Sequence, residues 1–464
     1  MQKNAWGKAG FFLAAVAFCG SAKAETLQDA LVAAYTSNPT LLAQRARLRA
    51  ADEAVPQALA NWRPTVKLTG DLTRTNFATN TNPVVGLVGA TSVATAKDYG
   101  VTITEPIYRG GRTVAQTKQA EAQVRAERAL LESTEQTVML NVITAYMNVV
   151  EYKAVLALSI NNEQVLQRQL DATNDRFRVG EVTRTDVAQA ESRLSAAHAD
   201  RTQAEGNLRA AVANYINVVG HAPENLVAPP PVADLPKSID EAHSQAMADN
   251  PNIRNAEYTY DAANYGIDLV AGELLPTVTF NGTALKSYEF LGPDTYEQEI
   301  QGQINLTVPL YQQGQEYSRL RQQKHTAGQD RIDVDVTRRD TVESVTRAWE
   351  ALQTARARIV SYTDQIRAAQ VALEGVQRES QVGSRTVLDV LNAEQELLNA
   401  KVNLVQAQHD ETVAAYQLRG TLGTLTASAL ALPVPVYDPQ QHYDEVREQW
   451  VGTSVSPSYG GAVK

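Results

Sequence analysis

The sequence contains two copies of one unit, and this duplication constrains the fold more than any other feature. A Val-Gly pair stands at Val179-Gly180 and returns at Val382-Gly383, 203 residues later. Nearer the amino terminus the spacing is 212 residues, so the first copy carries a longer loop between Val66 and Pro106. Two copies of one unit predict a subunit with pseudo-twofold symmetry. Other matched pairs are Pro106/Pro309, Tyr108/Tyr311, Gly111/Gly314, Asp186/Asp389, Glu191/Glu394, Gly220/Gly423, Asn38/Asn250 and Pro64/Pro276.

The first 24 residues have the pattern of an export signal. Two lysines precede a short apolar run, and Ala22-Lys23-Ala24 has the small-x-small pattern of a cleavage site. We expect residues 1–24 to be removed as a signal peptide, which would leave Glu25 as the first residue. Cys19 allows the alternative of lipid attachment, but Phe18 stands where such sites carry a small residue.

The charge balance argues against a nucleic-acid partner. The chain has 42 Lys and Arg against 52 Asp and Glu, a formal net charge of −10. Removing the predicted signal would remove three lysines and no acid, so the charge would become −13. Binding phosphates needs clustered Lys and Arg. Because Cys19 is the single cysteine and lies in the predicted signal, the mature chain would form no disulfide.

Each copy contains two stretches in which polar and apolar residues alternate strictly. In the first, Val66, Leu68 and Leu72 alternate with threonines and charged residues. Strict alternation predicts a strand with one wet face and one apolar face. Between the first two stretches, about 78–97, an Asn-, Thr- and Gly-rich segment predicts a loop. The predicted strands are about 65–77, 98–107, 277–287 and 297–310.

Each copy also contains a very long segment without proline, 112–178 and 315–381. Its Ala, Gln, Glu, Arg and Leu content favours helix. At 1.5 Å per residue each helix would be about 100 Å long, more than an ordinary globular domain allows. A return helix is expected after each Val-Gly pair, over 183–220 and 386–423.

The return helices carry apolar residues seven apart, such as Val187 and Leu194, which favours coiled-coil packing. The first copy would span 25–225 and the second 238–426, separated by a Pro-rich connector at 226–237. The tail, 427–464, is rich in Pro, Tyr and Gly, and we expect its last dozen residues to be disordered.

Strands of this length can cross a bilayer at the tilt that barrels use. A bilayer accepts strands only in a closed barrel, because every backbone polar group must be paired. One chain offers four strands, whereas roughly eight are needed for closure. The pattern therefore predicts a barrel shared between subunits, either a dimer with eight strands or a trimer with twelve.

One stretch resembles a known family. It is Val382-Gly383-Ser384-Arg385-Thr386-Val387-Leu388-Asp389-Val390-Leu391-Asn392-Ala393-Glu394, with a weaker twin from Arg176 to Val187. These residues resemble the TolC-type family of outer-membrane efflux proteins, and the resemblance covers about residues 26–426. It implies an α+β membrane protein: a homotrimer with a twelve-stranded barrel in outer-membrane lipid and a long α-helical tunnel across the periplasm. It also implies a periplasmic adaptor (membrane fusion) protein and an inner-membrane transporter as partners, for drug efflux or type I secretion.

The resemblance further implies a gate at the periplasmic tip of the tunnel, where turns 179–184 and 382–386 meet. Arg385 is similar to a family arginine that bonds the neighbouring helix pair at positions matching Thr185 and Asp186. Asp389 matches an acidic position that forms a ring around the pore. Adaptor docking is expected at the same turns, at Val179, Gly180, Val382 and Gly383.

Two positions depart from the family pattern of the gate. Ser380 replaces a tyrosine of the bonding network, and Asn392 replaces a second acid of the ring. We expect both changes to affect the tightness of the closed state and its affinity for cations. From spacing alone, Arg385 and Asp389 could instead form a local surface pair of little energetic value.

The remaining motifs do not indicate an enzyme. Gly110-Gly111-Arg112 lacks the spacing of a phosphate-binding loop, and glycine at a strand-to-helix junction explains it better. Six histidines lack metal-ligand spacing, and most are expected on solvated helix positions. No cofactor or metal is therefore expected. A structural or adhesive coiled-coil protein of the envelope is the alternative to a channel. The sequence does not name the cargo, the adaptor or the transporter.

Overall fold

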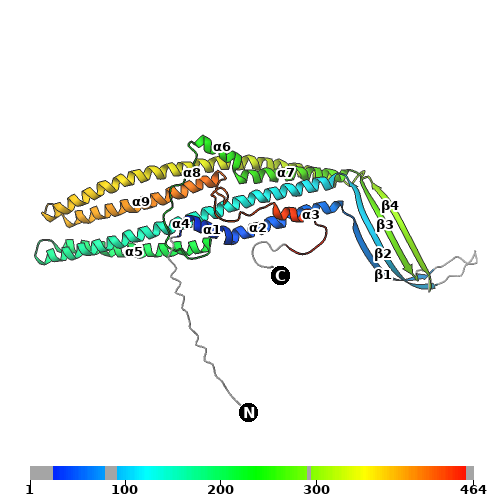
Figure 1. Cartoon of the computed structure of the whole chain (residues 1–464), viewed down its shortest axis with the longest axis horizontal. Coiled ribbons are helices and arrows are strands. Elements are labelled where there is room, and N and C mark those ends of the chain that lie inside the picture. Colours follow the sequence, from blue (N-terminus) through cyan, green and yellow to red (C-terminus); the bar gives the residue numbers. More distant parts are fainter. Residues whose placement is uncertain (1–24, 79–90, 290–293, 456–464) are drawn as a thin grey trace, which may run out of the picture. The chain divides into compact units, whose positions relative to one another are not determined.

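The computed structural model describes residues 25–78, 91–289 and 294–455. The predicted signal peptide, Cys19 and the end of the predicted disordered tail lie outside these ranges. Figure 1 shows the helices and strands along the chain. In order they are α1 (Leu27–Ser37), α2 (Pro39–Asp52), α3 (Ala54–Leu59), the 3₁₀ turn η1 (Ala60–Trp62), β1 (Thr65–Ala78), β2 (Thr91–Arg109), α4 (Arg112–Arg178), α5 (Arg184–Val219), α6 (Ile239–Asp249), α7 (Pro251–Ala271), the 3₁₀ turn η3 (Gly272–Leu274), β3 (Thr277–Tyr288), β4 (Tyr296–Thr307), α8 (Gln315–Gln381), α9 (Val387–Thr421) and α10 (Gln441–Val446).

The described residues divide into two compact units. One unit contains residues 25–36, 141–232 and 355–413, which include α5, most of α9 and the C-terminal parts of α4 and α8. The other contains the four strands, α2, α3, α6, α7 and α10. Each unit takes segments from both copies, so the copies are repeats of sequence and not separate compact units.

The four strands form one antiparallel sheet in the order β1-β2-β3-β4, which agrees with the predicted fold class. β2 is longer than expected because it begins at Thr91, where Ala78 pairs with it. The polar composition of 91–97 had indicated a loop, but its threonines and Val93 also suit a strand when a partner is available. β4 ends at Thr307, earlier than expected, two residues before Pro309, which cannot donate to a ladder.

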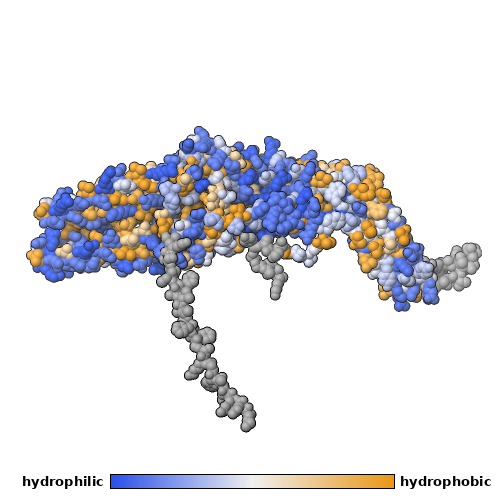
Figure 2. Space-filling view, viewed as in Figure 1, coloured by the Kyte–Doolittle hydropathy of each residue, from blue (hydrophilic) through white to orange (hydrophobic). Residues whose placement is uncertain are grey.

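The apolar face of the sheet is exposed in the single chain. Leu68 and Ile300 keep 80% and 78% of their surface, and hydrophobic surface covers part of the sheet in Figure 2. A soluble sheet would bury such a face, so its exposure fits contact with lipid. Near the hairpin ends, the rings of Tyr99 and Tyr288 pack edge to face at 6.4 Å between centroids.

Glycines allow the close turn from the sheet into the first long helix. Gly110 has φ +62°, a conformation that favours glycine. A Cβ on Gly110 would lie 2.4 Å from the carbonyl oxygen of Gly272, so no larger side chain fits there. This contact accounts for the Gly-Gly pair after β2 without any phosphate-binding role.

The Asn-Pro pair that both copies share starts a helix each time. Asn38 caps α2, its Oδ1 accepting from the amide of Thr40 at 3.0 Å, and Pro39 occupies the first turn. Asn250 caps α7 in the same way, through the amide of Asn252 at 2.8 Å. Asparagine suits an N-cap, and proline suits the first turn because it lacks an amide hydrogen.

The long helices α4 and α8 have 67 residues each, so each is about 100 Å long. Along α5 four buried alanines recur every seven positions, and Tyr215 and Val219 are buried toward the end of the helix. The alanines are Ala190, Ala197, Ala204 and Ala211. Val187 and Leu194, expected to form the seam, are only partly buried beside them. A row of alanines lets neighbouring helices approach closely. Within the described ranges, no helix combines the length and the apolar character needed to cross a membrane.

The described part of the tail, 427–455, packs within its own unit. His442 on α10 lies 3.0 Å from Asp52, whose side chain is fully buried, and Arg447 pairs with Glu121 at 3.3 Å. Contrary to expectation, only three of the six histidines are exposed. The exposed ones are His198, His221 and His325, and the others are partly buried in contacts of this kind.

Candidate gate at the two helix turns

The first turn joins α4 to α5 through a glycine in the left-handed region. Gly180 has φ +82°, and its amide donates to the carbonyl of Phe177 at 3.0 Å. The next amide, of Glu181, donates to the carbonyl of Arg176 at 2.9 Å. These bonds satisfy the last carbonyls of α4, as is common where a helix ends at glycine. Val179 beside the glycine is exposed.

The second turn, between α8 and α9, repeats this geometry. Gly383 has φ +79°, and its amide donates to the carbonyl of Ser380 at 3.2 Å. The amide of Ser384 donates to the carbonyl of Glu379 at 2.9 Å. Val382 is 78% exposed, like its counterpart in the first turn. The four residues expected at the turns therefore form two equivalent ends with apolar tips.

Both predicted gate aspartates lie in the first turn of a return helix and complete its capping box. Asp186 Oδ2 accepts from the amide and hydroxyl of Thr183, both at 2.8 Å. Asp389 Oδ2 accepts from the amide and hydroxyl of Thr386, at 3.0 and 2.9 Å. The bonds from Thr386 hold the pKa of Asp389 below its usual range, so this carboxylate stays charged. A carboxylate at a helix start also interacts favourably with the helix dipole.

Arg385 bonds a residue of its own turn. Its Nε donates to Glu379 Oε2 at 2.8 Å, and this contact raises the pKa of the guanidinium. Among the described residues of this one chain, Arg385 therefore contacts neither of its expected acceptors, Thr185 and Asp186. Within the described part of the chain no hydrogen bond joins Arg385 to Asp389, but the two charges interact, because each contributes to the shift in the pKa of the other.

The two departures from the family pattern lie at different depths. Ser380 is buried at the end of α8, with 6% of its surface exposed. Asn392 is exposed on α9, and its Oδ1 accepts from Arg193 Nη2 on α5 at 2.8 Å. Residue 392, which is acidic in the family pattern, is therefore an asparagine that joins the pair α8 and α9 to the pair α4 and α5.

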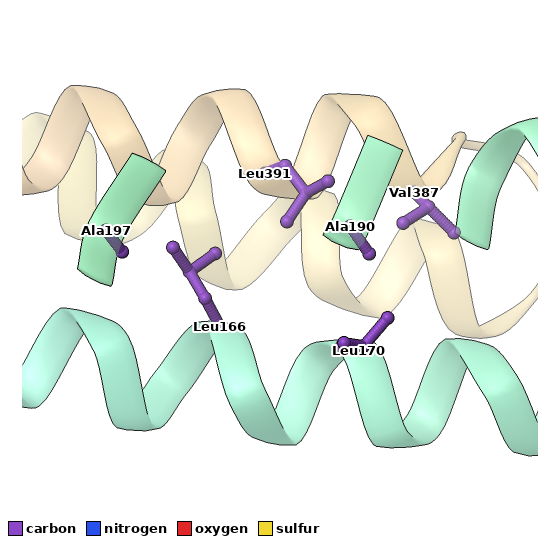
Figure 3. Packing of buried hydrophobic residues seen from close by; sticks show 6 residues of the cluster. All are labelled: Leu166, Leu170, Ala190, Ala197, Val387 and Leu391. Carbon is purple, nitrogen blue, oxygen red and sulfur yellow. The ribbon is translucent and has the colours of Figure 1, made fainter. Parts of the chain in front are cut away.

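A hydrophobic cluster lies directly behind the turns. Figure 3 shows its side chains between α4, α5 and α9, within a single unit. Leu391 is 1% exposed at its centre. Val182 and Val187 pack against the cluster from the first turn and the start of α5. Its buried members are Leu166, Leu170, Ala190, Ala197, Val387 and Leu391.

Sequence reasoning missed three features of this site. The Thr-x-x-Asp signature of a capping box, at 183–186 and 386–389, was available in the sequence. The ion pair between Arg385 and Glu379 had no comparable signal, because six residues separate the partners across a turn. The bond from Arg193 to Asn392 joins residues 199 positions apart and needs the packed structure.

Comparisons with known proteins agree with this architecture. The family model for "Outer membrane efflux protein" matches residues 30–221 and 242–424. Outer membrane efflux protein BepC of Brucella suis biovar 1 (strain 1330) is 36% identical over 433 residues, which cover 93% of this chain and 92% of BepC. Outer membrane protein TolC of Escherichia coli (strain K12) is 27% identical over 428 residues, covering 89% of this chain and 85% of TolC.

Among solved structures, the Campylobacter jejuni CmeC outer membrane channel has the same fold. Its TM-score is 0.79 at 16% identity, covering 91% of this chain and 89% of the CmeC chain. An envelope coiled-coil protein without transport activity, the alternative considered above, would not explain the sheet or the match across both copies. The chain belongs to the outer membrane efflux protein family and is therefore a channel of the outer membrane with a periplasmic helical extension, not an enzyme.

Proposed function

We propose that three copies of this chain form one duct, which takes cargo from an inner-membrane transporter through a periplasmic adaptor and releases it outside. The sheet supports a shared barrel because β1 and β4 are its two edges. An unpaired edge is not tolerated in lipid, so each edge needs the edge of another copy. Three copies would pair all edges in a barrel of twelve strands.

Exposed valines on α8 also support assembly with further copies. Val360 and Val371 keep 65% and 68% of their surface exposed. They are eleven residues apart, close to three helical turns, so they lie on one face of α8. An apolar row of this kind is costly in water and fits the helices of a neighbouring subunit.

The gate is proposed at the two turns. The bond from Arg385 to Glu379 uses one of the five donors of the guanidinium, so its Nη groups remain able to reach Asp186 and Thr185 of a neighbouring copy. Asp186 Oδ1 would accept, because capping uses Oδ2. Three Asp389 carboxylates near one axis would attract cations. A few such bonds hold a closed state that a partner can shift by binding the open form better.

The bond between Arg193 and Asn392 adds a latch inside each subunit. It joins α5 to α9 just behind the turns, at 2.8 Å between Nη2 and Oδ1. Opening that separates the two helix pairs of one subunit has to break this bond. In this proposal the side chain of Ser380 forms no bond of the gate, because it is buried under the second turn.

The cargo is proposed to be small molecules. BepC, at 36% identity, is named an efflux protein. Sensitivity to antibiotics of cells that lack the gene, with no change in secreted proteins, is the expected outcome. A loss of secreted protein without a change in antibiotic sensitivity would assign the duct to protein secretion.

The gate is tested by single-channel conductance of the purified protein in a planar bilayer. We expect a small, cation-preferring conductance that rises in Arg385→Ser. Arg378→Ser is the matched control, because Arg378 lies near the end of α8, just before the turn, and forms an exposed i,i+4 pair with Glu374 of that helix. Equal conductance in wild type, Arg385→Ser and control would exclude Arg385 from the gate. A wide-open wild type would keep the channel and remove the proposed closed state.

A further inference from the structure

Glu25, the first described residue, lies in a buried site, the Glu25 pocket, which Tyr146, Tyr215 and Glu224 form through hydrogen bonds to it. Only 8% of its surface is exposed. Its backbone nitrogen donates to the carbonyl of Glu224 at 3.2 Å, and its carboxylate accepts from the amide of Glu224 at 2.9 Å. All these residues belong to the same unit. Once residues 1–24 are removed, as the sequence predicts, Glu25 would be the start of the mature chain, where a residue is usually exposed and frayed.

Two buried tyrosines complete the pocket. The hydroxyl of Tyr215 donates to the Glu25 carboxylate, and neither tyrosine ring has measurable exposure. The hydroxyl of Tyr146 lies 3.0 Å from the Glu25 carbonyl and 2.6 Å from that of Val227, and it accepts from the Val227 amide at 3.0 Å. Burial and the nearby Glu25 carboxylate raise the pKa of Tyr215, which keeps its hydroxyl as a donor.

Two carboxylates act on the tyrosines of the pocket. Besides burial, Glu25 and the exposed Asp29 on α1 raise the pKa of both tyrosine hydroxyls. A cationic candidate facing Glu25 is His221, whose Nε2 lies 3.6 Å from Glu25 Oε1 and which is charged only when protonated. A buried carboxylate is costly unless a positive charge or several donors compensate it.

We propose that Glu25 is the first residue of the mature chain and that its free α-ammonium group, made by cleavage after Ala24, binds in this pocket. Cleavage replaces an amide with one hydrogen by an ammonium with three, at the position that already donates to Glu224. The α-amino group has a pKa near 8, so it is mostly protonated at neutral pH. The new charge would lie beside the buried carboxylate of its own residue. Removal of the signal thereby completes this part of the fold.

The pocket also explains why α1 packs against segments far away in the chain. The anchored residue fixes the start of α1 against α4, α5 and the chain that leads into the Pro-rich connector.

The first test is the intact mass of the protein purified from membranes, followed by labelling of its α-amine. An N-hydroxysuccinimide ester near pH 7 reacts mainly with α-amines, because lysine amines have a pKa about 2 units higher. We expect a chain that starts at Glu25 and an α-amine that reacts at least about tenfold more slowly in native than in denatured protein. Inserting Gly-Ser between Ala24 and Glu25 should abolish this protection.

Variants then test the pocket itself. Tyr215→Phe removes the donor to the carboxylate and should increase native labelling, whereas Tyr152→Phe, a half-buried tyrosine of the same unit, should not. A mature start at another residue, or an acylated Cys19, would overturn the proposal. Equal labelling of native and denatured wild type would also overturn it, and this measurement does not depend on any variant folding. None of these outcomes bears on the channel function.

Discussion

Replacing Leu391 by alanine should loosen the helix turns far more than removing an exposed polar contact there. Leu391 is 1% exposed at the centre of the cluster behind the turns, among side chains from α4, α5 and α9 (Figure 3). Truncating a buried leucine costs about 2–5 kcal/mol, depending on how far the cavity collapses. Leu166 and Leu170 extend from a rigid long helix, so little collapse is expected, and about 3 kcal/mol is a reasonable value.

That cost converts into a measurable change in local opening. Because 1.4 kcal/mol is a factor of ten, about 3 kcal/mol raises the open population roughly a hundredfold. Hydrogen exchange of the amides in the first turns of α5 and α9 reports this population, provided that exchange is limited by local opening. Amides at the other end of α5, far from the cluster, should exchange at wild-type rates.

Leu388→Ala is the matched control, three residues earlier on the same helix. Leu388 is 38% exposed and lies outside the cluster, so its truncation should raise exchange much less. If Leu388→Ala and Leu391→Ala accelerate exchange equally, the cluster does not hold the turns. If Leu391→Ala changes nothing, the turns are held from outside the subunit.

Two further predictions concern charge. Burial raises the pKa of Glu151, so the native state binds a proton that the unfolded chain has lost, and stability should fall as pH rises through this raised pKa. Glu151→Gln should therefore raise the melting temperature at pH 7.5, by a margin that shrinks near pH 5, and a constant margin would contradict this reasoning. Asn392→Asp should bond Arg193 more strongly, as a charged pair, and should add three carboxylates to the proposed pore, increasing cation selectivity in bilayers. Unchanged selectivity would place residue 392 away from the pore.

Local patterns in the sequence were sufficient to predict which segments form strands and which form helices. The period of the apolar residues and the composition of a segment are properties of residues that are close together in the chain. The alternation in β3 and β4 and the absence of proline in α4 and α8 indicated their type directly. The extent of β2 could not be predicted in this way. Residues such as Val93 become strand only because β1 offers them a partner.

The contacts of the site depended on information that the local pattern lacks. Apolar heptads indicated a seam, and Val390, Leu391 and Leu397 are indeed buried on α9. Along α5 the buried heptad row consists instead of alanines such as Ala190, which allow close approach of the helices. The partner of Arg385 was expected from the family on the neighbouring helix pair, at Thr185 and Asp186. Within one chain the arginine folds back onto Glu379, because that carboxylate lies across the same turn.

The two turns differ in a way that suits a ring built from alternating helix pairs. Both keep the left-handed glycine and the capping aspartate, because each helix end needs them. Their ion pairs are reversed in sign: Arg176 on α4 pairs with Glu181 in the first turn, whereas Glu379 on α8 pairs with Arg385 in the second. Residues 176 and 379 occupy equivalent positions of the repeat. In the proposed trimer each first turn would stand between two second turns, so opposite charges would face one another around the tip, whereas six identical turns would place like charges together.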